Sequence, residues 1–118
     1  MQSLEQERCD RLRNIVSGYF KAFAQKDINS LRTLLTPEVT LRDWDIYAEG
    51  IDAVMIANLA IFNAVETIIV IPIGIYISGN TIVAELTVEI NHEEPLKVVD
   101  ILEVAQSGKI CAIRAYKG

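Results

Sequence analysis

The spacing of apolar residues predicts two helices at the start of the chain. One set of apolar side chains recurs at intervals of three and four residues: Leu12, Ile15, Val16, Tyr19, Phe20 and Phe23. This spacing is typical of one buried helix face and predicts a helix over about residues 4 to 25. Asp27 is a candidate N-cap for a second, short helix, and Pro37 predicts the end of that helix near Thr36. The apolar residues of the second helix are Leu31, Leu34 and Leu35.

A short strand and a third helix are predicted next. Residues 40 to 44 are predicted to form a strand, because Val39, Leu41 and Asp43 alternate with the polar residues Thr40 and Arg42, and Gly50 then breaks the chain. A third helix is expected after Gly50, with the apolar residues Ala53, Val54, Ile56, Ala57, Leu59 and Ala60. The first half of the chain is therefore predicted to be mainly helical.

The second half of the chain has the period of two that is typical of strands. Isoleucine occupies every odd position from 69 to 77, and we interpret this row as core. A turn at residues 78–80 is followed by a second apolar row: Ile82, Ala84, Leu86, Val88 and Ile90. Residues 96–105 and 109–116 predict two more strands around a turn that contains Gly108. A long antiparallel meander is therefore expected.

Helices followed by a run of antiparallel strands indicate an α+β fold. We expect three N-terminal helices packed on one face of a strongly curved, mostly antiparallel sheet. The chain fits a single domain, residues 1–118, and its 51% hydrophobic content is enough for a core. Because a small apolar ligand commonly binds in a concave site of this kind, we expect a cone-shaped fold around a pocket.

Two carboxylates fall in otherwise apolar rows. Asp100 shares a predicted strand face with Leu96, Val98, Leu102 and Val104. Asp43 likewise follows Val39 and Leu41 in the alternation of the first strand. Because burying an unpaired, ionised carboxylate is costly, inward acids usually become neutral, form pairs or take part in chemistry. The pattern therefore predicts a small pocket lined by carboxylates.

Composition narrows the classes of partner. The formal net charge of -5 and the lack of a run rich in Lys and Arg argue against nucleic-acid binding. Cys9 and Cys111 are far apart and His92 is the only histidine, so we expect neither a metal site nor a cofactor. The longest apolar run, residues 68–77, is too short to span a membrane. Since the first ten residues carry no secretory signal, a cytoplasmic location is expected.

The order of the elements and several local motifs resemble the ketosteroid isomerase branch of the nuclear transport factor 2-like (NTF2-like) superfamily, a SnoaL-like group. The motifs are the Tyr19-Phe20 step, Asp43 at the end of the first strand, and the closing stretch VDILEVAQSGKICAIRAYKG. Tyr19 also stands eight residues before Asp27, as the family's tyrosine stands before an acid at the end of its first helix. The resemblance covers nearly the whole chain and implies the NTF2-like cone.

The resemblance also implies a reaction and a role for three residues. The family's general base matches Asp43, and the two donors of its oxyanion hole match Tyr19 and a protonated Asp100. The implied reaction is allylic isomerisation, or related enolate chemistry, of a small hydrophobic ketone without a cofactor. The apolar neighbours of Asp100 fit this role, because desolvation raises the pKa of a carboxyl group.

A homodimer is expected as well, because sheet-face dimers are common in this superfamily. The side chains that offer a mixed outer face for such a contact are Val83, Glu85, Thr87 and Glu89. Trp44 stands where the isomerases carry a proline, and Lys117 stands where they place an aromatic residue. We therefore expect the pocket mouth to be reshaped.

Each of the three residues also has a structural interpretation. Tyr19 could be a core aromatic, and Asp43 could cap a turn by accepting from nearby backbone amides. Asp100 could form an ion pair with Arg114 on the neighbouring strand. Two functional alternatives stay open for the whole protein: a non-catalytic module of the same fold that binds a small ligand or a partner chain, and a SnoaL-like polyketide cyclase.

Overall fold

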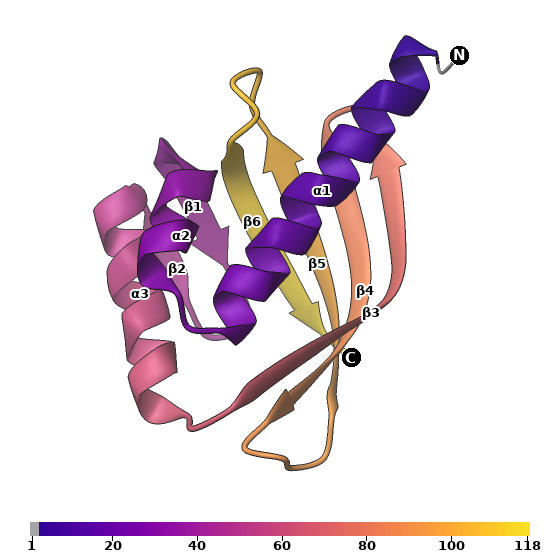
Figure 1. Cartoon of the computed structure of the whole chain (residues 1–118). Helices are drawn as coiled ribbons and strands as arrows, with labels where there is room; N and C mark the ends of the chain where they lie inside the picture. The colour runs from indigo at the N-terminus through magenta and orange to yellow at the C-terminus, as the bar shows by residue number, and fades with distance from the viewer. Residues whose placement is uncertain (1–2) are drawn as a thin grey trace.

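Three helices lie against one face of a six-stranded, strongly curved sheet in the computed structural model, which describes residues 3–118 (Figure 1). The helices are α1 (Leu4–Ala24), α2 (Ile28–Leu34) and α3 (Ile51–Ala64). The strands are β1 (Leu35–Arg42), β2 (Tyr47–Glu49), β3 (Ile68–Ser78), β4 (Thr81–Ile90), β5 (Leu96–Val104) and β6 (Ile110–Lys117). The expected α+β architecture is confirmed.

Local hydrogen bonds determine where the first two helices begin. Ser3 begins α1, since its hydroxyl accepts a hydrogen bond from the backbone N–H of Gln6. Asp27 begins α2, since its carboxylate accepts hydrogen bonds from both the backbone N–H and the hydroxyl of Ser30. The predicted first helix and the predicted N-cap of the second are therefore confirmed.

The boundary between α2 and β1 lies earlier than the pattern predicts. α2 ends at Leu34 rather than near Thr36, so Leu35 is a strand residue, and β1 ends at Arg42. The residue before a proline favours extended backbone, which stops the helix before Pro37. Pro37 itself lies where the pairing of β1 with β6 changes register, so its missing N–H interrupts no regular ladder.

The sheet places the first strands beside the last ones. Its order is β2-β1-β6-β5-β4-β3, in which β1 and β6 are parallel and the other neighbours are antiparallel. The predicted meander from β3 to β6 is confirmed, and β4 buries Ile82, Ala84 and Leu86 on the inner face as predicted. The parallel contact between β1 and β6 brings the segment that follows β1 close to β5.

The row of isoleucines in β3 is not continuous core, so that prediction was wrong. Its exposed members are Ile69, Ile71 and Ile73. Its members packed against the core are Ile75 and Ile77. The pairing of β3 with β4 shifts register between Pro72 and Gly74, where β3 carries one extra residue. Because strand side chains alternate, one extra residue moves the odd positions from the outer to the inner face.

The hydrophobic core lies between the helical layer and the inner face of the sheet. Both layers contribute fully buried side chains, including Val16, Leu31, Val54, Ile82, Leu102 and Ile113. Within residues 3–118, no helix is both long and apolar enough to cross a membrane. Part of the space under the curved sheet stays open as a cavity.

Candidate functional site

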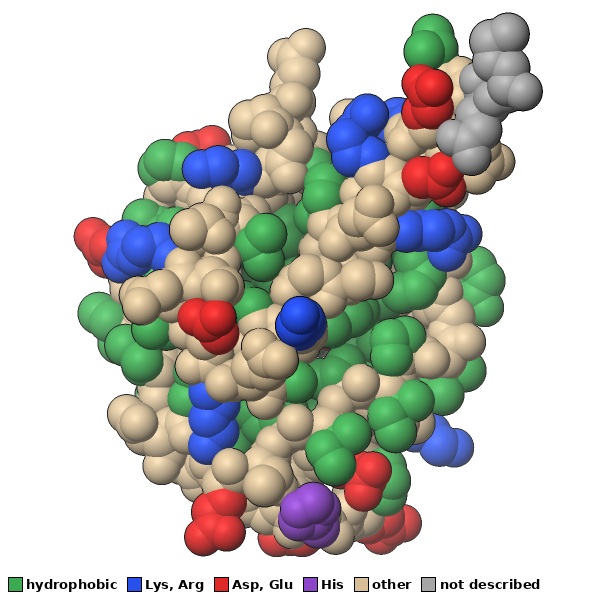
Figure 2. All heavy atoms as spheres, viewed as in Figure 1, with side chains coloured by type: hydrophobic (Ala, Val, Ile, Leu, Met, Phe, Trp, Pro, Cys, Tyr) green, Lys and Arg blue, Asp and Glu red, His purple; other side chains and the backbone are tan. Residues whose placement is uncertain are grey.

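A cavity of about 250 Å³ lies between α1, α3 and the inner face of the sheet. Apolar side chains form most of its wall, including Phe20, Phe23, Ile61, Leu86, Val98 and Ile113. Figure 2 shows hydrophobic side chains gathered below α1, over the strands that form this wall. The polar or acidic side chains that also line the cavity are Tyr19, Asp43, Asp45, Asn58 and Asp100. The structure thus brings all three predicted site residues to one cavity.

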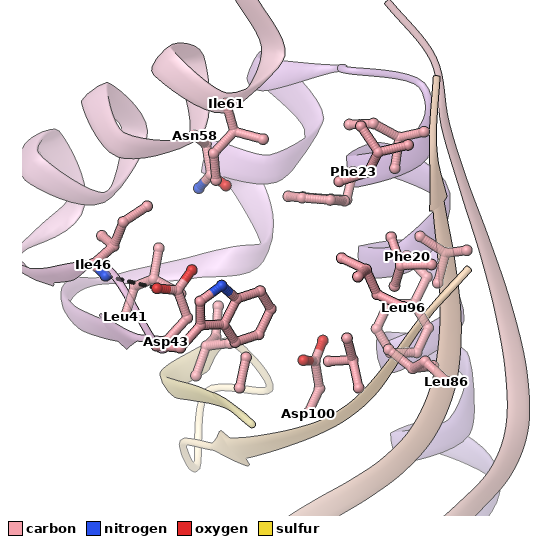
Figure 3. Close-up of a pocket in the computed structure, with 18 of the residues that line it drawn as sticks. Phe20, Phe23, Leu41, Asp43, Ile46, Asn58, Ile61, Leu86, Leu96 and Asp100 are labelled. Carbon is pink, nitrogen blue, oxygen red and sulfur yellow. Dashed lines mark hydrogen bonds between the residues drawn. The ribbon is translucent and has the colours of Figure 1, made fainter. Parts of the chain in front are cut away.

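Asp43 follows β1 and holds a tight turn. Its Oδ1 atom accepts hydrogen bonds from the backbone N–H groups of Asp45 (2.7 Å) and Ile46 (2.6 Å), and its own N–H donates to the carbonyl of Ile46. The predicted turn-capping role of Asp43 is therefore confirmed. Among residues 3–118 the second carboxylate oxygen makes no hydrogen bond, and Figure 3 shows the carboxylate beside the cavity.

Strand register brings Asp43 and Asp100 to the same region. In the parallel pairing Arg42 lies opposite Arg114, so the next residue, Asp43, lies level with Ala115. In the antiparallel pairing on the other side of β6, Ala115 lies opposite Asp100. The small side chain of Ala115 separates the two acids and leaves space between them. Both acids line the cavity, as Figure 3 shows.

Asp100 points inward from β5, as its alternating row predicts. Burial raises the pKa of Asp100 to about 7, and the negative charge of Asp43 acts in the same direction. The alternative interpretation of Asp100 as an ion-pair partner of Arg114 was wrong, because Arg114 lies opposite Ile101 on the outer face of the sheet. Arg114 instead donates a hydrogen bond to the carboxylate of Glu103 at 2.5 Å. Asp100 therefore faces the cavity without a cationic partner among residues 3–118.

Tyr19 contributes both to the core and to the cavity wall. It is 5% exposed, and its ring packs edge-on against Phe20 and stacks against Phe23, with ring centres 5.7 and 6.3 Å apart. Burial raises the pKa of Tyr19, and the charge of Asp100 adds to that effect. The hydroxyl makes no hydrogen bond within residues 3–118. Tyr19 therefore offers a protonated donor at the cavity.

Asn58 was not identified from the sequence. It lies on α3, is 2% exposed, and points into the cavity (Figure 3). Val54 and Phe62, one turn before and after it, are also buried, so Asn58 is an amide in an apolar helical row. This i, i+4 row is the sequence signal that could have found it.

The cavity mouth carries Trp44, which is 43% exposed. The ammonium group of Lys117 lies 5.4 Å from the centre of the indole ring, a distance at which a cation is attracted to the ring face. His92 lies in the exposed turn between β4 and β5 and is not among the residues that line the cavity. In the part of the chain that the structure describes, no group of three His, Cys, Asp or Glu side chains could hold a metal ion.

Comparison with protein families agrees with this geometry. The profile of the SnoaL-like domain matches residues 16–113, a segment that contains Tyr19, Asp43, Asn58 and Asp100. The chain belongs to the SnoaL-like domain family. A comparison of this SnoaL-like protein with curated proteins found no match.

Solved structures share the fold of this SnoaL-like protein. A Kribbella flavida protein provisionally named a ketosteroid isomerase aligns with a TM-score of 0.80 at 14% identity, covering 92% of this chain and 78% of that one. A Sinorhizobium meliloti protein provisionally named a polyketide cyclase aligns with a TM-score of 0.78 at 18% identity, and the alignment covers 86% of this chain and 93% of that one. An LEH-like epoxide hydrolase from M. tuberculosis aligns with a TM-score of 0.79 at 17% identity, and the alignment covers 92% of this chain and 84% of that one. At these identities the likeness shows the NTF2-like fold alone, so the reaction must be argued from the cavity.

Proposed function

We propose that this SnoaL-like protein catalyses proton transfer on a small hydrophobic ketone through an enolate, with allylic isomerisation as the reaction. The observation that carries the proposal is that Asp43, Tyr19 and Asp100 line one apolar cavity. A proton acceptor and two donors in a water-poor site are what enolate formation requires.

The proposed reaction assigns opposite tasks to the two acids. Asp43 removes a proton from the carbon next to the ketone and returns it two carbons along, so the double bond moves and no atoms are lost. Oδ1 of Asp43 is held by backbone N–H groups, so the other oxygen acts as the base. Tyr19 and protonated Asp100 donate hydrogen bonds to the enolate oxygen, and the raised pKa values of both groups support these roles.

The size of the cavity supports a small substrate. Its volume of about 250 Å³ lies below the range of about 300–1,000 Å³ that is usual for ligand pockets. The aromatic side chains of Phe20 and Phe23 and the aliphatic side chains around them favour an apolar ring. We therefore propose a ketone with one or two rings as the substrate class.

Titration with a naphthol tests the proposed donors, because the ionised naphthol resembles an enolate and its absorbance reports the ionisation. The wild-type protein is expected to bind the ionised form. Tyr19→Phe and Asp100→Leu should each weaken this binding about ten- to a hundredfold, because each removes a hydrogen bond to a charged oxygen.

Tyr47→Phe is the matched control for the naphthol titration. Tyr47 lies on β2, outside the cavity, and its hydroxyl donates a hydrogen bond to Glu49. The control should leave naphthol binding unchanged. If the wild type does not bind naphthol, or if the two cavity variants bind it as well as the wild type does, Tyr19 and Asp100 are structural residues.

Cyclisation of a polyketide is a second candidate function. It is favoured by the likeness to the Sinorhizobium meliloti protein and by the fact that an intramolecular aldol reaction also passes through an enolate. The small cavity favours isomerisation, since a polycyclic product needs more space. A product analysis distinguishes the two, because only cyclisation forms a carbon–carbon bond.

We also propose that the chain forms a homodimer through the outer face of the sheet. Ile69 and Ile71 lie opposite Glu89 and Thr87 in the pairing of β3 with β4, so they share the outer face predicted for the dimer. Ile71 is 44% exposed. Exposed apolar side chains rimmed by charged ones commonly mark a protein interface.

Ile71→Glu is expected to convert the dimer into a monomer, because a twofold contact places the new charge at the interface twice. Light scattering coupled to gel filtration should show the mass halved. Ile56→Glu is the matched control, since Ile56 is an exposed isoleucine on α3 rather than on the sheet. A monomeric wild type, or a dimeric Ile71→Glu variant, contradicts the proposed interface.

A further inference from the structure

Asn58 is a buried amide whose internal hydrogen bonds are incomplete. Its Nδ2 atom donates to the carbonyl of Val54 at 3.1 Å. That carbonyl, four residues earlier in α3, is also the helical acceptor of the backbone N–H of Asn58, so the extra bond does little to hold the helix. Among residues 3–118 the Oδ1 atom has no donor. Because an amide can accept two hydrogen bonds at its oxygen, Asn58 keeps unused acceptor capacity.

The bond to Val54 also determines the orientation of the Asn58 amide. Exchanging the amide nitrogen and oxygen would place two oxygens in contact, so the nitrogen must face the carbonyl of Val54. The Oδ1 atom therefore lies on the other side of the amide group. Figure 3 shows the end of this side chain directed into the cavity from α3, next to Ile61.

Asn58 and Asp100 belong to different walls of the cavity. Asn58 lies on α3, which packs against β1 and β2, whereas Asp100 lies on β5, beyond β6 in the sheet. Figure 3 shows Asn58 and Asp100 reaching the cavity from separate sides. A ligand whose carbonyl oxygen is bound at Tyr19 and Asp100, and which spans the cavity to α3, places its far atoms beside Asn58.

We infer that Asn58 is a specificity residue that accepts a hydrogen bond from a hydroxyl group of the substrate, remote from the reacting carbonyl. This inference rests on the proposed function, because it assumes that the ketone oxygen lies at Tyr19 and Asp100. The substrate class is therefore a small hydroxylated ketone rather than a purely hydrocarbon one.

The chemistry of the cavity favours a neutral hydroxyl over a charged group at Asn58. The amide oxygen of Asn58 is an acceptor, and the carboxylate of Asp43 also lines the cavity, so an anionic substituent at Asn58 is repelled. An ammonium group would lose its hydration in an apolar wall without an ionised partner at Asn58. A hydroxyl costs less to desolvate and satisfies the unused acceptor.

A panel of naphthols with a second hydroxyl at each position of the far ring tests the inference. One isomer is expected to bind the wild-type protein about tenfold more tightly than the parent naphthol, the effect of one added hydrogen bond. Asn58→Leu, of similar volume, should lose the preference for that isomer over the parent naphthol. Its melting temperature should rise, because the substitution removes a buried amide with incomplete hydrogen bonds.

Two further variants make the result decisive. Asn58→Ala also lacks the amide but leaves space, so it should lose the preference even if the leucine variant folds poorly. Ile61→Val, on the same wall of α3, changes volume without polarity and should keep the preference. If the parent naphthol binds and no dihydroxy isomer is preferred, or if the preference survives in both Asn58 variants, the inference fails and the proposed function stands. If the parent naphthol does not bind, the proposed function fails and this inference with it.

Discussion

Replacing Asp43 by Asn is expected to lower the rate of proton transfer about a hundred- to ten-thousand-fold while leaving ligand affinity unchanged. A carboxamide cannot take a proton from carbon at neutral pH. Its oxygen can still accept the two backbone hydrogen bonds from Asp45 and Ile46, so the turn after β1 should keep its shape. The measurement is the isomerisation of a β,γ-unsaturated cyclohexenone to its conjugated isomer, followed by ultraviolet absorbance. Exchange of the ketone's α-protons with deuterated solvent, followed by NMR, measures proton removal alone.

Asp45→Asn is the matched control for Asp43→Asn. Asp45 is an exposed acid in the same loop, and its side chain also borders the cavity. The control should retain isomerisation and exchange. If Asp43→Asn keeps both activities, another group is the base. If neither wild type nor variant has activity but both bind the naphthol, the chain is a binding module with the same cavity.

Asp100 is expected to make the folded protein less stable as the pH rises toward and beyond neutrality. The ordinary pKa of an aspartate side chain is 3.8, and burial raises the pKa of Asp100 to about 7 in the folded chain. Between these pH values the folded chain therefore binds more protons than the unfolded chain does. The stabilising contribution of protonated Asp100 is therefore complete below about pH 4 and is lost as the pH rises through about 7. Between about pH 5 and pH 8 the loss amounts to roughly 2 to 3 kcal/mol of unfolding free energy.

Urea unfolding at a series of pH values measures this contribution. Asp100→Asn should lack the pH-dependent loss, so its stability relative to the wild type should increase from acid to alkaline pH. Glu94→Gln, in the exposed turn between β4 and β5, is the control, because water surrounds that side chain in the folded and the unfolded chain. If the unfolding free energies of the wild type and of Asp100→Asn change with pH in the same way, Asp100 is not desolvated in the folded protein.

The candidate site was largely visible in the sequence, because its residues interrupt regular patterns. Asp100 stands in an apolar row of a strand without a bulge between Leu96 and Leu102, so counting by twos gives the correct face. Asn58 lies in a comparable row of α3, but that helix is apolar on more than one side, and Ile56 on it is 68% exposed. The row of Val54, Asn58 and Phe62 is therefore one of several apolar rows on α3, and the pattern alone does not show which of these rows is buried.

By itself the sequence determined the order and type of every element except the three-residue strand β2, the buried faces of α1, β4 and β5, and the inward direction of Asp43 and Asp100. These features depend on local periodicity, caps and turns, which neighbouring residues decide. Only the tertiary structure decided the parallel pairing of β1 with β6, the bulge that divides the isoleucine row of β3, and the pairing of Arg114 with Glu103 instead of Asp100. Each of these depends on which strand lies alongside and in what register, and that is a contact between residues far apart in the chain.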